Sequence, residues 1–343
     1  MEKCDILSFD FDELTNEIIR IGEKKFRAKQ IYEWLHIKKV TDFNQMTNIP
    51  LAFITKLNEK FCIKSLNIVR KLESSIDNTV KYLYGLSDGN YIETVLMDYK
   101  HGNSICISTQ VGCKMGCKFC ASTIAGFKRN LLPSEMLLQI YETEKNSGIK
   151  VDSIVLMGIG EPLDNFDNVI KFLQILSSEQ GRNMSLRHVS LSTCGLVDKI
   201  YSLAEYKFGL TLSISLHAVT DSKRSQIMPV NNKYNISELL QACRDYILKT
   251  GRRISFEYAV ISGVNDSHDD AKKLIALLKG INCHVNLIPV NEIKERNFKS
   301  NKNTLQTFRT ELETGGLNVT IRRTLGSDIN AACGQLRREY EII

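Results

Sequence analysis

ICISTQVGCKMGCKFC, residues 105–120, places Cys113, Cys117 and Cys120 in a C-x3-C-x2-C array on a loop that follows a short apolar run. Structural zinc sites use four ligands, usually in two separated pairs, whereas cubane iron–sulfur clusters are held by thiolates and can leave one iron open for a substrate. Three thiolates without a fourth therefore favour an iron–sulfur cluster. The alternatives are a zinc loop completed by a distant residue such as His101, or buried thiols that bind nothing.

The chain around this loop alternates between short apolar runs and longer amphipathic segments. The apolar runs predict strands at 104–108, 153–157, 188–192, 210–216, 253–260, 283–288 and 318–322. The amphipathic segments predict helices at 134–147, 165–178, 200–205, 236–248, 269–278 and 304–313. This alternation is typical of an α/β fold with a parallel sheet, and roughly six to seven βα units predict a partial (β/α)6-type barrel. The cysteine loop would then lie at the carboxyl ends of the strands, where barrels have their active sites.

The segments on either side of the barrel follow other patterns. Residues 1–61 place apolar side chains at helical spacing, which predicts a small helical accessory domain. Residues 62–98 alternate between apolar and polar side chains and contain the turn Asp88-Gly89-Asn90, which predicts a few antiparallel strands. The barrel would span 99–330 and a C-terminal tail 331–343, with no linker between these parts.

Composition and charge bound the class of protein. Of the 343 residues, 43% are apolar and 24% are charged, which is typical of a folded globular chain. No apolar run approaches the ~18 residues of a membrane span and the acidic N-terminus has no secretory pattern, so a cytoplasmic protein without membrane contact is expected. Ten cysteines in that reducing compartment indicate metal binding or catalysis rather than a disulfide framework. The net charge of +6 permits an anionic partner.

A second turn carries residues suited to a small ligand. The strand predicted at 153–157 runs into Gly158-Ile159-Gly160-Glu161-Pro162. A Rossmann site is disfavoured, because the third glycine of the dinucleotide fingerprint is missing and a proline follows. Close approach of the backbone to a small ligand fits better, although such turns also end strands that bind nothing.

Several longer segments narrow the identification. They are ICISTQVGCKMGCKFC (105–120), GFKRNL (126–131), MGIGEPLDN (157–165), LSTCGL (191–196), SLHA (215–218) and RRTLGSDINAACGQL (322–336). Together they resemble the RlmN/Cfr family of radical S-adenosylmethionine (SAM) RNA adenine methyltransferases. The resemblance implies a radical SAM barrel, a helical N-terminal domain that recognises RNA, and a [4Fe-4S] cluster that binds SAM and is held by Cys113, Cys117 and Cys120.

The resemblance also implies roles for residues outside the cysteine array. Cys333 matches the methyl carrier that becomes S-methylcysteine, Cys106 matches the resolving cysteine that forms a transient disulfide with it, and Glu93 matches the proton acceptor. From the residues alone, both cysteines would be small buried hydrophobes and Glu93 an exposed strand carboxylate. The SAM-binding residues carried over from the family are Gly160, Glu161, Ser192, Ser215, Leu216, His217 and Asn291.

The chemistry explains why two cysteines are needed outside the cluster. C2 of adenine is an electron-poor carbon, so it cannot act as a nucleophile and take the methyl group directly from SAM. In the family's route one SAM methylates the Cys333 thiolate, and a second SAM is cleaved to a 5′-deoxyadenosyl radical that takes a hydrogen atom from that methyl group. The methylene radical adds to adenine, Cys106 releases the product as the disulfide forms, and cellular thiols reduce the disulfide.

The partners implied by the resemblance are nucleic acids and a reductant. They are 23S rRNA at adenosine 2503, tRNA at adenosine 37, and an external electron donor such as flavodoxin, with the enzyme itself a monomer. Basic residues for phosphate contacts occur at 24–29, 128–129, 252–253, 294–302, 322–323 and 337–338, although each could be an ordinary solvated face.

Two alternatives to this function remain open. One is a Cfr-type enzyme that methylates C8 of adenine in 23S rRNA and confers antibiotic resistance. The segments GEPLDN and STCGL resemble the C2 branch of the family more. The other is an RNA-binding iron–sulfur protein without methylation activity, in which Cys106 and Cys333 would have no purpose.

Overall fold

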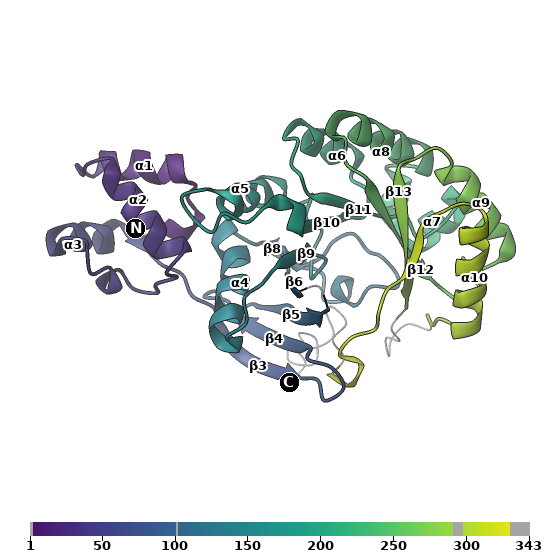
Figure 1. Ribbon diagram of the computed structural model, residues 1–343, viewed down its shortest axis with the longest axis horizontal. Coiled ribbons are helices and arrows are strands. Elements are labelled where there is room, and N and C mark those ends of the chain that lie inside the picture. The colour runs from purple at the N-terminus through teal and green to yellow at the C-terminus, as the bar shows by residue number, and fades with distance from the viewer. Residues whose placement is uncertain (1–2, 101, 291–297, 330–343) are drawn as a thin grey trace.

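The computed structural model describes residues 3–100, 102–290 and 298–329, and in these ranges ten strands form one sheet (Figure 1). Across the sheet the strand order is β14 (Val319–Ile321), β13 (Cys283–Pro289), β12 (Ile254–Val260), β11 (Thr211–Ser215), β10 (Val189–Thr193), β9 (Ser153–Leu156), β6 (Gly102–Cys106), β5 (Tyr91–Tyr99), β4 (Val80–Gly85) and β3 (Asn67–Glu73). From β6 to β14 all neighbouring strands are parallel, and from β3 to β6 they are antiparallel.

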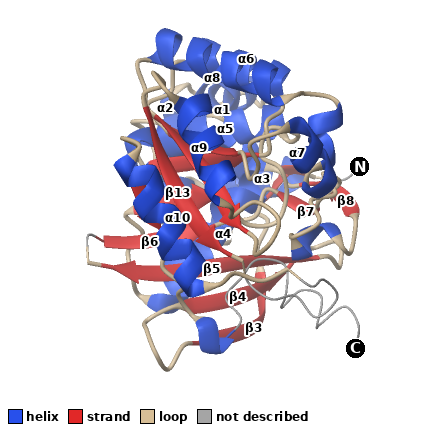
Figure 2. Cartoon of the chain, turned by 90° about the vertical axis from the view of Figure 1, so that its right-hand side faces the viewer, coloured by secondary structure: helices blue, strands red, loops and turns tan. Residues whose placement is uncertain are grey.

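Helices connect the parallel strands and lie outside the curved sheet (Figure 2). They are α4 (Pro133–Ser147), α5 (Phe166–Ser177), α6 (Val197–Glu205), α7 (Asp221–Ile227), α8 (Ile236–Thr250), α9 (His268–Leu278) and α10 (Lys302–Thr314). The α/β class and the partial barrel predicted from the alternating pattern are therefore confirmed. The sequence analysis missed α7, whose seven residues are too few for a clear helical period.

The longer helices begin and end at residues that cap them. Pro133 occupies the first turn of α4, where a missing N–H costs nothing, and Gly148 closes that helix in the left-handed conformation at φ 71°. Helix α8 begins with a capping box between Asn235 and Glu238 and ends at Gly251, which is also left-handed.

The antiparallel strands extend the barrel sheet without a break. Strand β6 pairs antiparallel with β5 on one side and parallel with β9 on the other. The domain boundary predicted near residue 99 therefore does not interrupt the sheet, and the strands predicted for residues 62–98 form its outer edge.

The helical unit at the N-terminal end lies beside the barrel (Figure 1). It contains α1 (Phe11–Arg20), α2 (Phe26–His36) and α3 (Leu51–Lys60), joined by a short parallel pair of β1 (Cys4–Asp5) and β2 (Phe61–Cys62). Its contacts with the barrel helices include ion pairs from Lys39 to Glu144 at 2.5 Å and from Lys171 to Glu13 at 2.6 Å. Short 3-10 turns complete the described chain at Ile6–Ser8, Phe43–Gln45, Ala121–Thr123, Leu186–His188, Pro229–Asn232 and Ser327–Ile329.

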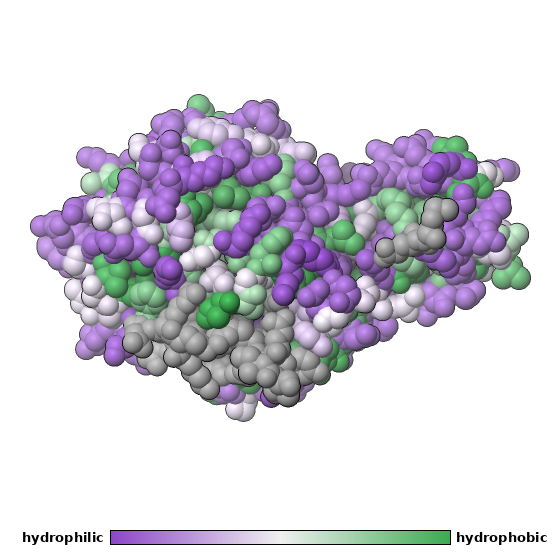
Figure 3. Space-filling model, turned by 180° about the vertical axis from the view of Figure 1, so that it is seen from behind, coloured by the Kyte–Doolittle hydropathy of each residue, from purple (hydrophilic) through white to green (hydrophobic). Residues whose placement is uncertain are grey.

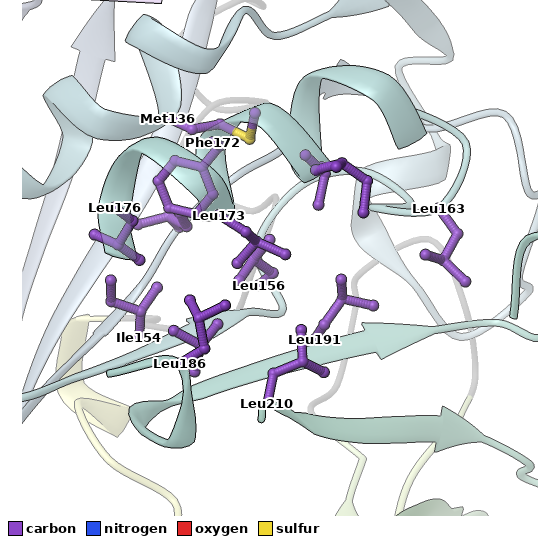
Figure 4. Packing of buried hydrophobic residues seen from close by; sticks show 14 of the residues in the cluster. Met136, Ile154, Leu156, Leu163, Phe172, Leu173, Leu176, Leu186, Leu191 and Leu210 are labelled. Carbon is purple, nitrogen blue, oxygen red and sulfur yellow. The ribbon is translucent and has the colours of Figure 1, made fainter. Parts of the chain in front are cut away.

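The hydrophobic core fills the space between the sheet and its helices. Figure 4 shows Met136 of α4 and Phe172, Leu173 and Leu176 of α5 above Ile154 and Leu156 of β9. Seen from behind, the surface is mainly hydrophilic and narrows between the helical unit and the barrel (Figure 3). Among the described residues no helix has the length and apolarity needed to cross a bilayer.

Candidate active site

A cavity of about 510 Å³ opens at the carboxyl ends of the parallel strands. This volume lies within the ~300–1,000 Å³ range of small-molecule sites. Its wall brings together most of the predicted site residues, namely Cys106, Cys113, Cys117, Cys120, Gly160, Glu161, Ser192, Ser215 and His217. Residues far apart in the chain therefore meet where a barrel has its active site.

The cysteine loop is held by a short hairpin that the sequence analysis did not predict. Strands β7 (Gln110–Gly112) and β8 (Phe127–Asn130) pair antiparallel on either side of the loop. Gly112 has φ +78°, and a Cβ atom there would lie 1.8 Å from the carbonyl oxygen of Gly126, so only glycine fits. The loop is also tied to α7, because the Lys118 N–H donates to the Ile227 carbonyl at 2.8 Å.

The three cysteine thiols are chemically suited to a metal cluster. Burial raises the pKa of Cys113 to about 12 and also raises the pKa of Cys117. A bound metal reverses this preference, because it stabilises the thiolate. Cys113, Cys117 and Cys120 share one wall of the cavity. Three sulfur donors on one cavity wall still fit a [4Fe-4S] cluster with one open iron.

The turn after β9 forms the next part of the wall. A Cβ atom at Gly158 would lie 2.5 Å from the Ile107 carbonyl oxygen, and one at Gly160, with φ +113°, would lie 2.7 Å from Gln110. Both glycines therefore allow close packing of this turn against the strand that leads to the cysteines. The Glu161 carboxylate accepts hydrogen bonds from the N–H groups of Cys194 at 2.7 Å and Leu163 at 3.0 Å, and burial raises its pKa.

His217 projects into the cavity from the end of β11 with a fixed tautomer. Its Nδ1 accepts a hydrogen bond from the Ala259 N–H at 2.9 Å, so the ring proton is carried by Nε2. Burial lowers the pKa of His217 to about 3, with a smaller contribution from Arg224, and the ring is neutral at physiological pH. The ring packs edge-on against Phe119 of the cysteine loop, with centroids 4.8 Å apart.

Other predicted residues lie beside the cavity or outside the described chain. Leu216 is fully buried in the core and does not line the cavity. Glu93 is also absent from the lining, and it is buried rather than exposed, which contradicts the reading of this residue from composition alone. Its carboxylate forms an ion pair with Lys81 at 3.0 Å, and the two side chains are 3% and 0% exposed. Asn291 and Cys333 lie outside the described residues, as does His101.

Three charged residues near the site were missed by the sequence analysis. Lys81 pairs with Glu93, Arg224 is fully buried beside the cavity, and Glu257 of β12 lines the cavity wall. The Glu257 carboxylate accepts a hydrogen bond from the Asn286 side-chain amide at 2.8 Å, and burial raises its pKa. A charged residue inside the apolar run ISFEYAV was an available signal, because a charge at that position of a barrel strand faces the interior.

Comparison with known proteins agrees with this arrangement. Residues 4–63 match the ribosomal RNA large subunit methyltransferase N-terminal domain, and residues 107–275 match the radical SAM superfamily. A probable dual-specificity RNA methyltransferase RlmN of Lachnoclostridium phytofermentans is 55% identical over 99% of this chain and 96% of its own length. Another, of Clostridium perfringens, is 56% identical over 98% of this chain and 97% of its own length. The crystal structure of a radical SAM methyltransferase from Sphaerobacter thermophilus has a TM-score of 0.92 at 38% identity and covers 97% of this chain and 98% of that one.

Proposed function

The chain belongs to the RlmN family of radical SAM RNA methyltransferases, and from that premise we propose that it methylates C2 of adenosine in RNA through a methylated cysteine. The observation that carries the proposal is the position of Cys106, which lines the same cavity as Cys113, Cys117 and Cys120. A resolving cysteine has to reach the methyl carrier beside the product, and a cavity position meets that need. A protein that only binds RNA has no use for it.

The chain's own residues divide the work between binding and proton or methyl transfer. When bound, the reduced cluster and SAM supply a 5′-deoxyadenosyl radical, with Cys113, Cys117 and Cys120 as the cluster ligands. Cys333 carries the methyl group to adenine. The bond between the Cys333 sulfur and the methylene carbon breaks as the disulfide to Cys106 forms, and Glu93 accepts the proton lost from C2. The released carbon takes up one proton from solvent to complete the methyl group, and the unpaired electron of the adduct passes to the external electron carrier.

The sheet geometry supports the pairing of Glu93 with Cys106. Cys106 of β6 lies opposite Val95 of β5, so the two side chains share one face of the sheet. Glu93 precedes Val95 by two residues and therefore faces the same side. The Glu93 carboxylate forms a direct ion pair with Lys81 at 3.0 Å, which holds it on this face of the sheet.

Two groups in the proposed SAM site have a defined hydrogen-bonding role, one as a donor and one as an acceptor. His217 offers a neutral Nε2–H donor to the cavity. The remaining lone pairs of the Glu161 carboxylate can accept hydrogen bonds from the SAM ammonium group. Gly160, Ser192, Ser215 and Leu216 complete the described part of the proposed site, and Asn291 belongs to it on the family resemblance alone.

The proposed substrates are 23S rRNA and tRNA, at adenosines 2503 and 37, in the cytoplasm of the cell. Lys24, Lys25 and Lys29 are exposed on the helical unit, and Arg322 and Arg323 line the cavity, so both regions can contact phosphates. Arg129 is a poorer candidate than its sequence position suggested, because it is committed to ion pairs with Asp88 and Glu135. The target base has to flip out to reach the cavity.

Mass spectrometry of nucleosides tests this proposal. Ribosomal and transfer RNA lacking the modification are incubated with anaerobically reconstituted enzyme, SAM and a reductant such as flavodoxin. We expect 2-methyladenosine in both RNAs, and none with Cys106→Ala despite retained RNA binding. Formation of 8-methyladenosine would assign the enzyme to the Cfr branch, and the lack of any methylated adenine would refute the proposal.

A further inference from the structure

Arg224 of α7 is a buried cation that the proposed reaction does not yet use. Its side chain is fully buried, yet among the described residues no carboxylate oxygen lies within 4.0 Å of its guanidinium. Burying an arginine without a carboxylate partner is costly, so its hydrogen bonds have to satisfy the guanidinium instead. Such a costly arrangement beside a ligand cavity indicates a functional role.

The hydrogen bonds of Arg224 join two strand ends at the cavity. Nε donates to the Leu216 carbonyl at 3.1 Å, and Nη2 donates to the carbonyls of Ser215 at 3.1 Å and Cys194 at 2.7 Å. Nη1 donates to the side-chain oxygen of Asn231 at 3.1 Å. The guanidinium thus ties the end of β11 to the loop that follows β10. These are the two strand ends that carry Ser192, Ser215 and His217.

The backbone on either side of these bonds is shaped to receive the guanidinium. His217 follows the bonded carbonyls of Ser215 and Leu216 and has a left-handed φ of 56°, an uncommon conformation for a residue with a side chain. Gly195 follows Cys194 with φ +102°, and a Cβ atom there would lie 3.4 Å from the Arg224 Nη2 and 2.9 Å from Leu239. A side chain at position 195 would collide with Leu239 and strain the backbone, so the turn that presents the Cys194 carbonyl to the guanidinium requires glycine.

Helix α7 also reaches the cysteine loop. Its last residue, Ile227, accepts the hydrogen bond from Lys118, and a Cβ atom at Gly116 would contact Pro229 at 3.4 Å. Ile227 and Met228 pack with Cys117 and Cys194 in one buried cluster. Arg224 Nη2 donates to the Cys194 carbonyl at 2.7 Å, and Cys194 packs in the same cluster as Cys117, so the guanidinium lies close to the cysteine loop.

We propose that Arg224 is a positioning residue of the cofactor site, which fixes the ends of β10 and β11 around SAM and raises the reduction potential of the cluster through its buried charge. The inference rests on the proposed function, because it requires the cluster and SAM to occupy this cavity. The expected increase in the reduction potential follows from electrostatics. Reduction adds negative charge to the cluster, and a nearby cation in a medium of low dielectric constant stabilises that charge.

Redox titration of the cluster, followed by electron paramagnetic resonance, tests the charge. In reconstituted holoenzyme, Arg224→Met should lower the equilibrium constant for reduction about tenfold, which corresponds to ~59 mV for a one-electron couple. Arg224→Lys keeps the charge and should stay near the wild-type potential. Because lysine cannot reproduce the set of bonds to three carbonyls, both variants should bind SAM at least about tenfold more weakly. Equal potentials for wild type and Arg224→Met would overturn the proposed charge effect, and unchanged SAM affinity would overturn the positioning role.

Asn231→Asp tests the charge without removing Arg224. The variant keeps the size of the side chain and the bond from Nη1 and adds a carboxylate that offsets the guanidinium charge, while it gives up the Asn231 Nδ2 bonds to the Asp221 carbonyl and the Ser225 hydroxyl. It should lower the reduction potential, and an unchanged potential would contradict the proposal even if Arg224→Met does not fold.

Arg182→Met is the matched control, because Arg182 is a largely buried arginine paired with Glu144 and bonded to Val151 before the amino end of β9. It should lose folding stability without changing the potential. If wild type neither binds a cluster nor methylates RNA, the proposed function fails, whereas variants that match an active wild type refute only the role of Arg224.

Discussion

At the scale of single residues, the pair of Lys81 and Glu93 is the feature that sequence patterning described least well. Alternation predicted the strands that carry them, but an alternating pattern does not show which charged side chains face inward when both sheet faces are covered. The structure buries both groups and pairs them at 3.0 Å. That the cysteine array, the glycine turn and Cys106 belong to one site was predictable, because motif spacing and family resemblance single out these residues without knowledge of packing, and all of them line one cavity.

The buried pair leads to a prediction about stability. Lys81→Met leaves the Glu93 carboxylate buried without its cation, so it should lower the free energy of unfolding by about 3–5 kcal/mol. Chemical denaturation followed by circular dichroism measures this change. The double variant Lys81→Met/Glu93→Met should recover most of the loss, because it removes both charges together. Additive losses would show that the pair does not act as a unit.

At the scale of elements, the long helices and most parallel strands were predicted to within a few residues, because their apolar periods are clear. Helix α7 and the β7–β8 hairpin were not, although they hold the cysteine loop and Arg224. Each is short, and each is fixed by contacts with distant segments, such as the bond from Lys118 to Ile227, which no local pattern encodes. The elements of the site that could not be predicted from the sequence are therefore those that hold the cysteine loop and Arg224 in place.

The hairpin leads to a prediction about cluster binding. Gly112→Ala should displace the β7–β8 hairpin, because the new methyl group would collide with the Gly126 carbonyl, and reconstitution should incorporate much less iron and sulfide. Gly126→Ala is a matched control in the same hairpin: its φ is +69°, but no atom lies within 4 Å of the added carbon. The control should lose only about 1–2 kcal/mol from backbone strain and still bind the cluster. Equal iron content in both variants would contradict this role for Gly112.

At the scale of the whole molecule, the helical unit is docked on the barrel through buried polar groups. His36 of α2 lies 3.1 Å from the Tyr141 hydroxyl of α4, and burial lowers its pKa to about 3. The unfolded chain protonates this histidine near pH 6.5, whereas the folded protein does not. The buried, neutral His36 therefore lowers the free energy of unfolding as pH falls below about 6.5, and this loss grows until about pH 3.

This difference predicts how the molecule responds to acid. Below about pH 6.5 the free energy of unfolding should fall by up to about 1.4 kcal/mol per pH unit through His36, and His36→Gln should make that fall less steep. Denaturation followed by the fluorescence of Trp34, the single tryptophan of the chain, reports on the same helix. Parallel pH profiles for the two proteins would show that His36 does not contribute.

The measurement that tests the account most directly uses SAM with a fully deuterated methyl group. The enzyme is incubated with unmodified 23S rRNA and tRNA under anaerobic conditions, and the mass of the product nucleoside is measured by mass spectrometry. Transfer through a cysteine-bound methylene group removes one deuterium from the methyl group, so the account predicts 2-methyladenosine that retains two deuterium atoms. Product that retains all three would show direct transfer of an intact methyl group and would contradict the proposed roles of Cys333 and Cys106.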